Sequence, residues 1–210
     1  MISLIASIIL AYLIGSIPTA VWYGKKFHNI DVREFGSGNA GATNTFRVLG
    51  KKAGGIVFGI DVFKGFIAAN ISIYTFANTP FSENMILFKI ILGIACVIGH
   101  VFPIFASFKG GKGVATLLVI TIALHPLAAT FCLFSFIVIL LTTKYVSLGS
   151  MLSALIFCLI LQTSTFKTEN NITLTIYGFS VFILLVLTHT KNIKRLLAGN
   201  ENKIYLFKKN

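Results

Sequence analysis

Long apolar stretches alternate with short polar segments along almost the whole chain. The apolar stretches cover residues 2–23, 54–77, 84–106, 113–124, 126–143, 146–165 and 171–190. A helix needs roughly 20 mainly apolar residues to cross a bilayer, and most of these stretches approach that length. The pattern therefore predicts an all-α integral membrane protein, a polytopic bundle of about seven transmembrane helices.

The fourth stretch leaves the number of crossings open. Residues 113–124 are too few for a full crossing, and His125 and Pro126 follow directly. Residues 113–143 could therefore form one bent or re-entrant hairpin in place of two crossings. Seven crossings, or five crossings with a hairpin, both place the two ends of the chain on opposite sides of the membrane.

The composition leaves no room for a separate soluble domain. Of the 210 residues, 56% are hydrophobic and only 11% are charged, whereas about a quarter of the residues of a soluble domain carry charge. We therefore expect a single transmembrane domain over residues 1–210.

The positive charge lies on one side of the predicted bundle. The formal net charge is +12, and Lys and Arg gather between the first two stretches, before the fourth, after the fifth and in the tail. Because loops rich in Lys and Arg stay in the cytoplasm, we predict a cytoplasmic C-terminus and an N-terminus outside. The chain is thus expected to be a multi-pass protein of the inner (cytoplasmic) cell membrane.

Three polar segments, rich in glycine, amide and basic residues, interrupt the apolar stretches. They are SGNAGATNTFR at 37–47, KGGKGVAT at 109–116 and HTKNIKRLLAGNE at 189–201. A lipid-facing helix has no use for such residues, because each buried polar group costs free energy unless it is paired. Their shared chemistry is anion binding, so we expect a phosphate or a similar anion to be handled at one membrane face.

The first two segments have the chemistry of a phosphate cradle. Glycines in the first let successive backbone N–H groups converge on an anion, and Arg47 adds a planar fork that matches phosphate oxygens. A flexible linker or a helix contact between small residues is the alternative. The second segment leads into a helix, whose unpaired N–H groups can hold phosphate beside Lys109 and Lys112. It is not a nucleotide P-loop, because Gly113 stands where Ser or Thr is required.

The third segment carries a histidine near an amide. On a helix, positions 189, 192, 195 and 196 fall roughly on one face, so His189 and Asn192 could point together into a site. His189 could act as a general base, a hydrogen-bond donor or a phosphate ligand. A lone histidine at a membrane interface is usually an ordinary paired polar residue, but the nearby Asn192 favours function.

Two further polar groups lie within the apolar stretches. Asp61 and Lys64 are one helical turn apart, which membrane burial permits only if they neutralise each other or face a polar cavity. His100 precedes the second segment and could line the same pocket. Only six acidic residues occur and they are scattered, so no metal ion is expected. No cofactor and no nucleic acid partner are expected either.

The three segments, in this order between these apolar stretches, resemble the motifs of the bacterial acyl-phosphate:glycerol-3-phosphate acyltransferase (PlsY) family. The matching patterns are SGN-x-GA-x-N-x-x-R at 37–47, KGGKGVAT at 109–116 and H-x-x-N-I-x-R-L-x-x-G-x-E at 189–201. The resemblance covers essentially the whole chain. It implies transfer of a fatty acyl group from acyl phosphate to the 1-hydroxyl of sn-glycerol 3-phosphate at the cytoplasmic membrane face. The products would be lysophosphatidic acid and inorganic phosphate, in the first step of phospholipid biosynthesis.

The same resemblance implies site residues and partners. Catalytic roles fall to His189, Asn192 and Lys109. The partners would be acyl phosphate, sn-glycerol 3-phosphate, membrane lipid and, by function, an enzyme that produces acyl phosphate. Two questions stay open: which segment holds which phosphate, and whether His189 or a substrate phosphate takes the hydroxyl proton. The implied substrate-binding residues are Ser37, Gly38, Asn39, Asn44, Arg47, Gly110, Gly111, Lys112, Thr116, Arg195 and Glu201.

Two other classes of protein share some of these features. A small transporter or channel for an anionic solute could use the same cations, but the sequence has no internal repeat and its polar segments map to one membrane face. A lipid acyltransferase with a His-x4-Asp motif does not fit, because none of the four histidines has an aspartate at that spacing.

Overall fold

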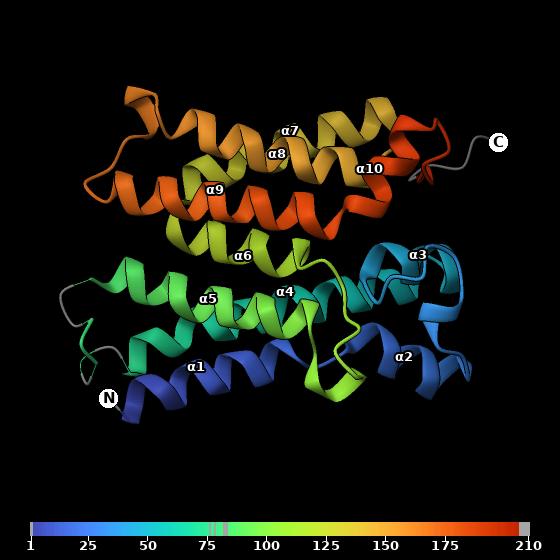
Figure 1. Ribbon diagram of the computed structural model, residues 1–210, viewed down its shortest axis with the longest axis horizontal. Helices are drawn as coiled ribbons and strands as arrows, with labels where there is room; N and C mark the ends of the chain where they lie inside the picture. The colour runs from blue at the N-terminus through green and yellow to red at the C-terminus, as the bar shows by residue number, and fades with distance from the viewer. Residues whose placement is uncertain (1, 76, 78, 82–83, 206–210) are drawn as a thin grey trace. The chain divides into compact units, whose positions relative to one another are not determined.

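The computed structural model describes residues 2–75, 77, 79–81 and 84–205, and within these ranges every regular element is a helix (Figure 1). The chain divides into two compact units, Met1–Leu124 and His125–Asn210. The predicted all-α fold is confirmed, while the predicted single domain over residues 1–210 stays a prediction.

The first unit is built around α4. Its helices are packed closely enough that a Cβ on Gly15 of α1 would lie 1.9 Å from the carbonyl oxygen of Cys96 in α5, which is the close approach that small residues allow between membrane helices. α1 packs on α5 and α4, and α4 also packs on α3, α5 and α6. The helices are α1 (Ile2–Gly15), α2 (Thr19–His28), α3 (Ala42–Leu49), α4 (Lys51–Thr75), α5 (Met85–Val101) and α6 (Val114–Leu124), with short 3-10 turns η1 (Val32–Glu34) and η3 (Ile104–Ala106).

The first apolar stretch is not one helix. α1 ends at Gly15 and α2 begins at Thr19, because Pro18 has no N–H to donate and its ring clashes with the turn before it. The prediction of a single helix over residues 2–23 is therefore wrong in detail. The two helices together still form an apolar run of 27 residues, Ile2–His28, and the break exposes backbone carbonyls within the unit.

The second unit has α8 at its centre, packed on α7 and α9, while α10 contacts α9. His125 caps the start of α7: its Nδ1 accepts from the N–H of Ala128 (3.2 Å), and its Nε2 lies 2.9 Å from the carbonyl oxygen of Phe166. His125 thus has a structural role in this unit. The helices are α7 (Pro126–Thr143), α8 (Val146–Ile160), α9 (Asn171–Thr188) and α10 (Thr190–Leu197), with a 3-10 turn η4 (Ser164–Phe166).

Five of the described helical runs are long and apolar enough to cross a membrane. The other two apolar helices are shorter. α6 has 11 residues and α8 has 15, so they span about 16 Å and about 22 Å against a hydrocarbon core of about 30 Å. The count of seven crossings and the sides of the two termini stay predictions.

The polar segments lie at helix ends within each unit. In the first unit, α2, α3 and the loop before α6 lie at the end of the helices opposite the N-terminus (Figure 1). In the second unit, α10 lies at the same end as the turn between α7 and α8 (Figure 1), and the N–H of Ile204 donates to the carbonyl of Lys144 there (2.9 Å). Each unit thus carries a polar end on an apolar helical body.

Candidate active site

The first segment forms a tight loop that is closed by Asn44. The buried Asn44 Oδ1 accepts from the N–H (2.8 Å) and hydroxyl (3.1 Å) of Ser37. Its Nδ2 donates to the carbonyls of Val32 (2.7 Å) and Phe35 (3.0 Å). Gly36 has a φ of 63°, and a Cβ there would lie 2.4 Å from that Oδ1, so the turn requires glycine. Ser37, Gly38 and Asn39 of this loop are exposed or half-exposed.

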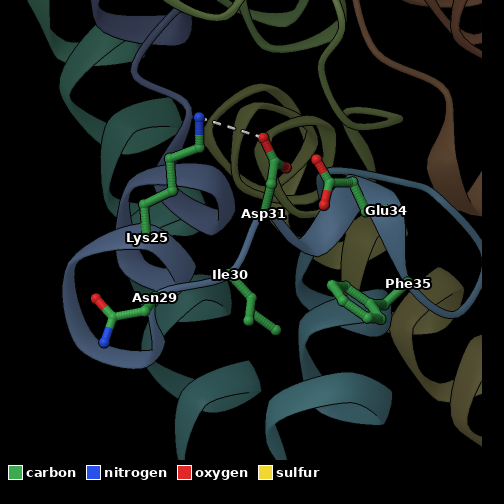
Figure 2. A pocket seen from close by; sticks show the side chains of 6 residues that line it. All are labelled: Lys25, Asn29, Ile30, Asp31, Glu34 and Phe35. Carbon is green, nitrogen blue, oxygen red and sulfur yellow. Dashed lines mark ion pairs between the residues drawn. The ribbon is translucent and has the colours of Figure 1, made fainter.

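Arg33 ties this loop to the loop that precedes α6. Its Nη1 donates to the backbone carbonyls of Ala106 (3.0 Å) and Lys109 (3.5 Å). Its Nε and Nη2 donate to the two carboxylate oxygens of Asp31 (2.9 and 2.7 Å), and Lys25 forms an ion pair with Asp31 at 3.4 Å (Figure 2). Asp31 therefore holds Arg33 where it joins the first two segments. Lys25 and Asp31 also border a hollow of about 530 Å³, lined by Lys25, Asn29, Ile30, Asp31, Glu34 and Phe35.

Asp31→Asn is expected to destabilise the protein at neutral pH by roughly 1 kcal/mol, or about 3 °C in unfolding temperature. The hydrogen bond from Arg33 lowers the pKa of Asp31 from 3.8 to about 2. A lowered folded-state pKa stabilises the protein above the ordinary pKa. This stabilisation is lost as the pH falls from 3.8 to about 2. The difference in unfolding temperature between the wild type and Asp31→Asn should shrink as the pH falls across this range. Glu34→Gln, at an exposed neighbour, should show no comparable difference from the wild type.

The second segment begins with a loop, Lys109–Gly113, which we call the glycine loop. The N–H groups of Gly110 and Gly111 donate to the carbonyls of Val101 and His100, both at 3.1 Å. These two N–H groups are therefore used within the chain. The phosphate cradle predicted from the N–H groups at the start of the following helix, beside Lys109 and Lys112, stays a prediction. The glycines serve close packing: a Cβ at 110 would lie 2.0 Å from the His100 carbonyl oxygen, and a Cβ at 111 would lie 2.1 Å from its Nε2.

The glycine loop borders a narrow crevice that also meets the first segment. Asp61 and Lys64 face it as an ion pair at 2.9 Å, with only 3% and 4% of their side chains exposed. The sequence left two alternatives for this pair, mutual neutralisation or a polar cavity, and the structure shows an ion pair that also lines the crevice. The prediction that His100 lines the same pocket is confirmed. The crevice is lined by Ile17, Pro18, Thr19, Ala40, Asp61, Lys64, His100, Pro103, Gly110 and Gly111.

The cations of the first unit differ in exposure. Lys109 is exposed, whereas Lys112 in the same loop and Arg47 in the last turn of α3 are half-buried. Thr116, in the first turn of α6, is fully buried, and its hydroxyl donates to the carbonyl of Asp61 (3.2 Å). The first unit thus brings the first and second segments together.

The third segment lies in the second unit and is broken at His189. α9 ends at Thr188 and α10 begins at Thr190, with His189 between them as the N-cap of α10. The carbonyl of His189 accepts from the N–H of Ile193 (2.8 Å), so His189 and Asn192 belong to the same first turn, and their pointing together into a site stays a prediction. The His189 ring is 2% exposed, and its Nδ1 lies 2.7 Å from the carbonyl oxygen of Leu185. Because a carbonyl only accepts, Nδ1 carries the proton. In the neutral ring the acceptor nitrogen is then Nε2.

Glu201 organises the rest of this segment. Its Oε1 accepts from Asn192 Nδ2 (2.6 Å) and the Ser147 hydroxyl (3.1 Å), and its Oε2 accepts from Arg195 Nε (2.8 Å). Burial raises the pKa of Glu201, but the three hydrogen bonds and the Arg195 charge outweigh it and hold the pKa below the ordinary 4.5. The carboxylate is therefore ionised and fixes both Asn192 and Arg195. Whether this cluster lies with the other two segments stays a prediction.

The sequence did not point to every residue of these clusters. Ser147, Thr19 and Arg33 were not predicted as site residues. Ser147 follows the basic turn at Lys144 and lies in the first turn of α8, which is a weak signal of a functional position. No three His, Cys, Asp or Glu side chains of the described residues are grouped as metal ligands.

These features define a polytopic integral membrane protein whose glycine-rich and basic segments lie at the ends of apolar helices. The chain belongs to the glycerol-3-phosphate acyltransferase family, whose model matches residues 5–199. This membership confirms the resemblance drawn from the three segments.

Relatives and solved structures agree over almost the whole chain. A glycerol-3-phosphate acyltransferase of Chlorobaculum tepidum is 41% identical and covers 100% of both chains. One of Salinibacter ruber is 38% identical over 98% of this chain and 94% of the relative. The crystal structure of PlsY (YgiH), an integral membrane glycerol 3-phosphate acyltransferase in its glycerol 3-phosphate form, is 36% identical. It superposes with a TM-score of 0.81, covering 97% of this chain and 96% of that chain; a lysophosphatidic acid form gives a TM-score of 0.79.

Proposed function

We propose that this protein transfers a fatty acyl group from acyl phosphate to the 1-hydroxyl of sn-glycerol 3-phosphate. The observation that carries the proposal is its 36% identity, over 97% of the chain, to a protein solved in glycerol 3-phosphate and lysophosphatidic acid forms. Family membership over residues 5–199 supports the same activity. The products are lysophosphatidic acid and inorganic phosphate.

The reaction is a direct acyl transfer. The 1-hydroxyl oxygen attacks the acyl carbonyl carbon, a new C–O ester bond forms, and the C–O bond to the phosphate breaks. Phosphate leaves with the bonding electron pair, and the hydroxyl proton passes to a base. Because phosphate is a good leaving group, no covalent enzyme intermediate is needed, and the protein has mainly to position the substrates and stabilise charge.

The site residues divide into those that contact substrate and those that fix the substrate-contacting residues in place. Lys109, Lys112 and Arg47 supply cations for phosphate, with Ser37, Gly38 and Asn39 beside them. In the second unit His189 and Asn192 orient the acceptor, and Arg195 adds a further cation. The holding residues are Asn44, Gly110, Gly111, Thr116 and Glu201, whose polar groups or close contacts are used within the chain.

The donor also accounts for the place of the reaction. An acyl phosphate with a long chain is a lipid, so a site at the end of apolar helices can take it from the bilayer while glycerol 3-phosphate enters from water. We place this end at the cytoplasmic face of the inner membrane, because the Lys and Arg residues gather there. The donor must come from an enzyme that makes acyl phosphate, which is the functional partner that we propose.

Purified protein with glycerol 3-phosphate is expected to release phosphate and form lysophosphatidic acid from acyl phosphate but not from acyl-CoA. Phosphate release and the lipid product are measured together, and a reaction without glycerol 3-phosphate gives the background hydrolysis. Activity with acyl-CoA alone would contradict the proposed donor. Flux of glycerol 3-phosphate or phosphate across proteoliposomes without product would instead favour the transporter class.

A further inference from the structure

His100 lies at the end of α5 and contacts both a buried ion pair and the glycine loop. The residue is 7% exposed, and its Nδ1 lies 3.7 Å from Asp61 Oδ1. Its carbonyl accepts from the N–H of Gly111 (3.1 Å). The ring therefore stands between the charges of α4 and the loop that carries Lys109 and Lys112.

The ion pair beside the ring, and the backbone that carries it, are held by groups from the α1–α2 break, with Thr19 at its end, and from the start of α6. Lys64 Nζ donates to the carbonyl of Ile17 (3.2 Å), which lies in the break between α1 and α2 and also accepts from the N–H of Thr19 (3.0 Å). Asp61 Oδ1 accepts from the hydroxyl of Thr19 (3.2 Å), and its backbone carbonyl accepts from Thr116 (3.2 Å). Charges inside an apolar helix are expensive and are retained mainly where they serve a site. Here they join the α1–α2 break, α4 and the start of α6.

The glycine loop fits against His100 with no spare room. A Cβ at position 111 would lie 2.1 Å from the His100 Nε2, and one at position 110 would lie 2.0 Å from its carbonyl oxygen. The first contact is made by the side chain and the second by the backbone. The imidazole ring, together with the hydrogen bond from the Gly111 N–H to the His100 carbonyl, therefore sets how closely Gly111 approaches α5.

We propose that His100 is a positioning residue for the glycine loop. Its ring, supported by the Asp61–Lys64 pair, fixes the distance of Gly111 from α5. This distance sets where Lys109 and Lys112 present their charges. This inference rests on the proposed function, in which these lysines hold a substrate phosphate. Loss of the ring lets the loop settle against α5 and moves the cations away from the phosphate.

His100→Ala is expected to raise the KM for glycerol 3-phosphate or for acyl phosphate by about tenfold, with kcat changed less than threefold or so, because misplaced cations weaken ground-state and transition-state binding alike. A purely structural histidine would act differently. Its loss would lower the fraction of active protein, so the apparent kcat would fall while both KM values stayed unchanged. That pattern would overturn the proposal.

A pair of double variants tests the contact itself. In Gly111→Ala the new methyl group collides with the ring, so this variant should raise the KM that His100→Ala raises. Adding His100→Ala to Gly111→Ala should return this KM to the value of His100→Ala alone. The matched control is Gly110→Ala, whose clash is with the His100 carbonyl, which His100→Ala retains. That double variant should stay at least as impaired as Gly110→Ala alone. A KM that falls equally in both double variants, or in neither, would contradict the inference.

Thermal unfolding of the same variants separates this inference from the proposed function. If Gly111→Ala does not fold, recovery of monodisperse protein in the double variant with His100→Ala, but not in the Gly110→Ala double variant, gives the same answer as the KM values. If the wild-type protein makes no lysophosphatidic acid from either donor, the proposed function fails, and the positioning role fails with it even if the unfolding temperatures show coupling between positions 100 and 111.

Discussion

Glu201→Ala is expected to lower the unfolding temperature of the detergent-solubilised protein by roughly 10 °C, corresponding to about 3 kcal/mol. Only 2% of the Glu201 side chain is exposed, and its carboxylate accepts from Ser147, Asn192 and Arg195. Removing it leaves a guanidinium without its counter-charge and two buried donors without their acceptor, each of which carries a desolvation cost.

The loss should reach function as well as stability. Without the carboxylate, the Asn192 amide is no longer fixed, so the variant that remains folded should show little acyl transfer. Glu201→Gln keeps the side-chain volume and part of the hydrogen bonding. Its unfolding temperature and activity should lie between those of the wild type and Glu201→Ala. Lys191→Ala, at an exposed position of α10, is the control and should unfold within about 1 °C of the wild type. A shift of less than 3 °C or so for Glu201→Ala would contradict this account of the cluster.

The same carboxylate gives a pH dependence with a definite sign. Because its folded-state pKa is below 4.5, the ionised cluster stabilises the protein above that pH. The stabilisation is lost as the pH falls below 4.5 toward the folded-state pKa. The gap between the wild type and Glu201→Ala should therefore be widest near neutral pH and should narrow in acid.

The helices of this chain follow from its hydrophobicity, but their interruptions do not. A count of apolar residues predicts the runs now seen as α4, α5, α7 and α9, because burial in a membrane needs only length and low polarity. The break between Gly15 and Thr19 depends on a single proline. The break at His189 has no sequence signal, since both neighbours continue the helical pattern.

The residues of the candidate site were easier to predict than what each one does. The sequence showed where glycines and cations cluster, yet it could not show that the Asn44 amide closes its own loop or that the N–H groups of Gly110 and Gly111 are already used. The direction of a hydrogen bond depends on the path of the backbone, which composition does not fix.

Sequence separation explains which pairs could be predicted. Asp61 and Lys64 are three residues apart on one helix, and such neighbours follow from helical geometry alone. Arg33 meets the carbonyl of Ala106 across 73 residues, and Ser147 meets Glu201 across 54. Contacts between residues so far apart in the sequence depend on how the helices pack, so no local sequence pattern predicts them.

His189→Asn is expected to lower kcat by about a hundredfold while leaving the unfolding temperature within about 3 °C of the wild type. Asparagine can still donate an amide hydrogen to the Leu185 carbonyl, which now lies 2.7 Å from Nδ1, but it has no atom at the position of Nε2. His189→Gln places a side-chain amide nearer that position and should recover part of the rate. Equal rates for the wild type and His189→Asn would remove the imidazole from the reaction.

The pH–rate profile then decides which group takes the hydroxyl proton. The second ionisation of a phosphate monoester lies near pH 6 or so, so a substrate phosphate can serve as the base while Nε2 only accepts a hydrogen bond from the acceptor hydroxyl. In that arrangement, which we expect, the decline of kcat/KM in acid persists in His189→Asn at a lower absolute rate. If the imidazole itself is the base, the variant loses that acid limb, because the titrating group is gone. The Nδ1–H bond to Leu185 presents Nε2 as an acceptor in both cases, so only the shape of the profile separates them.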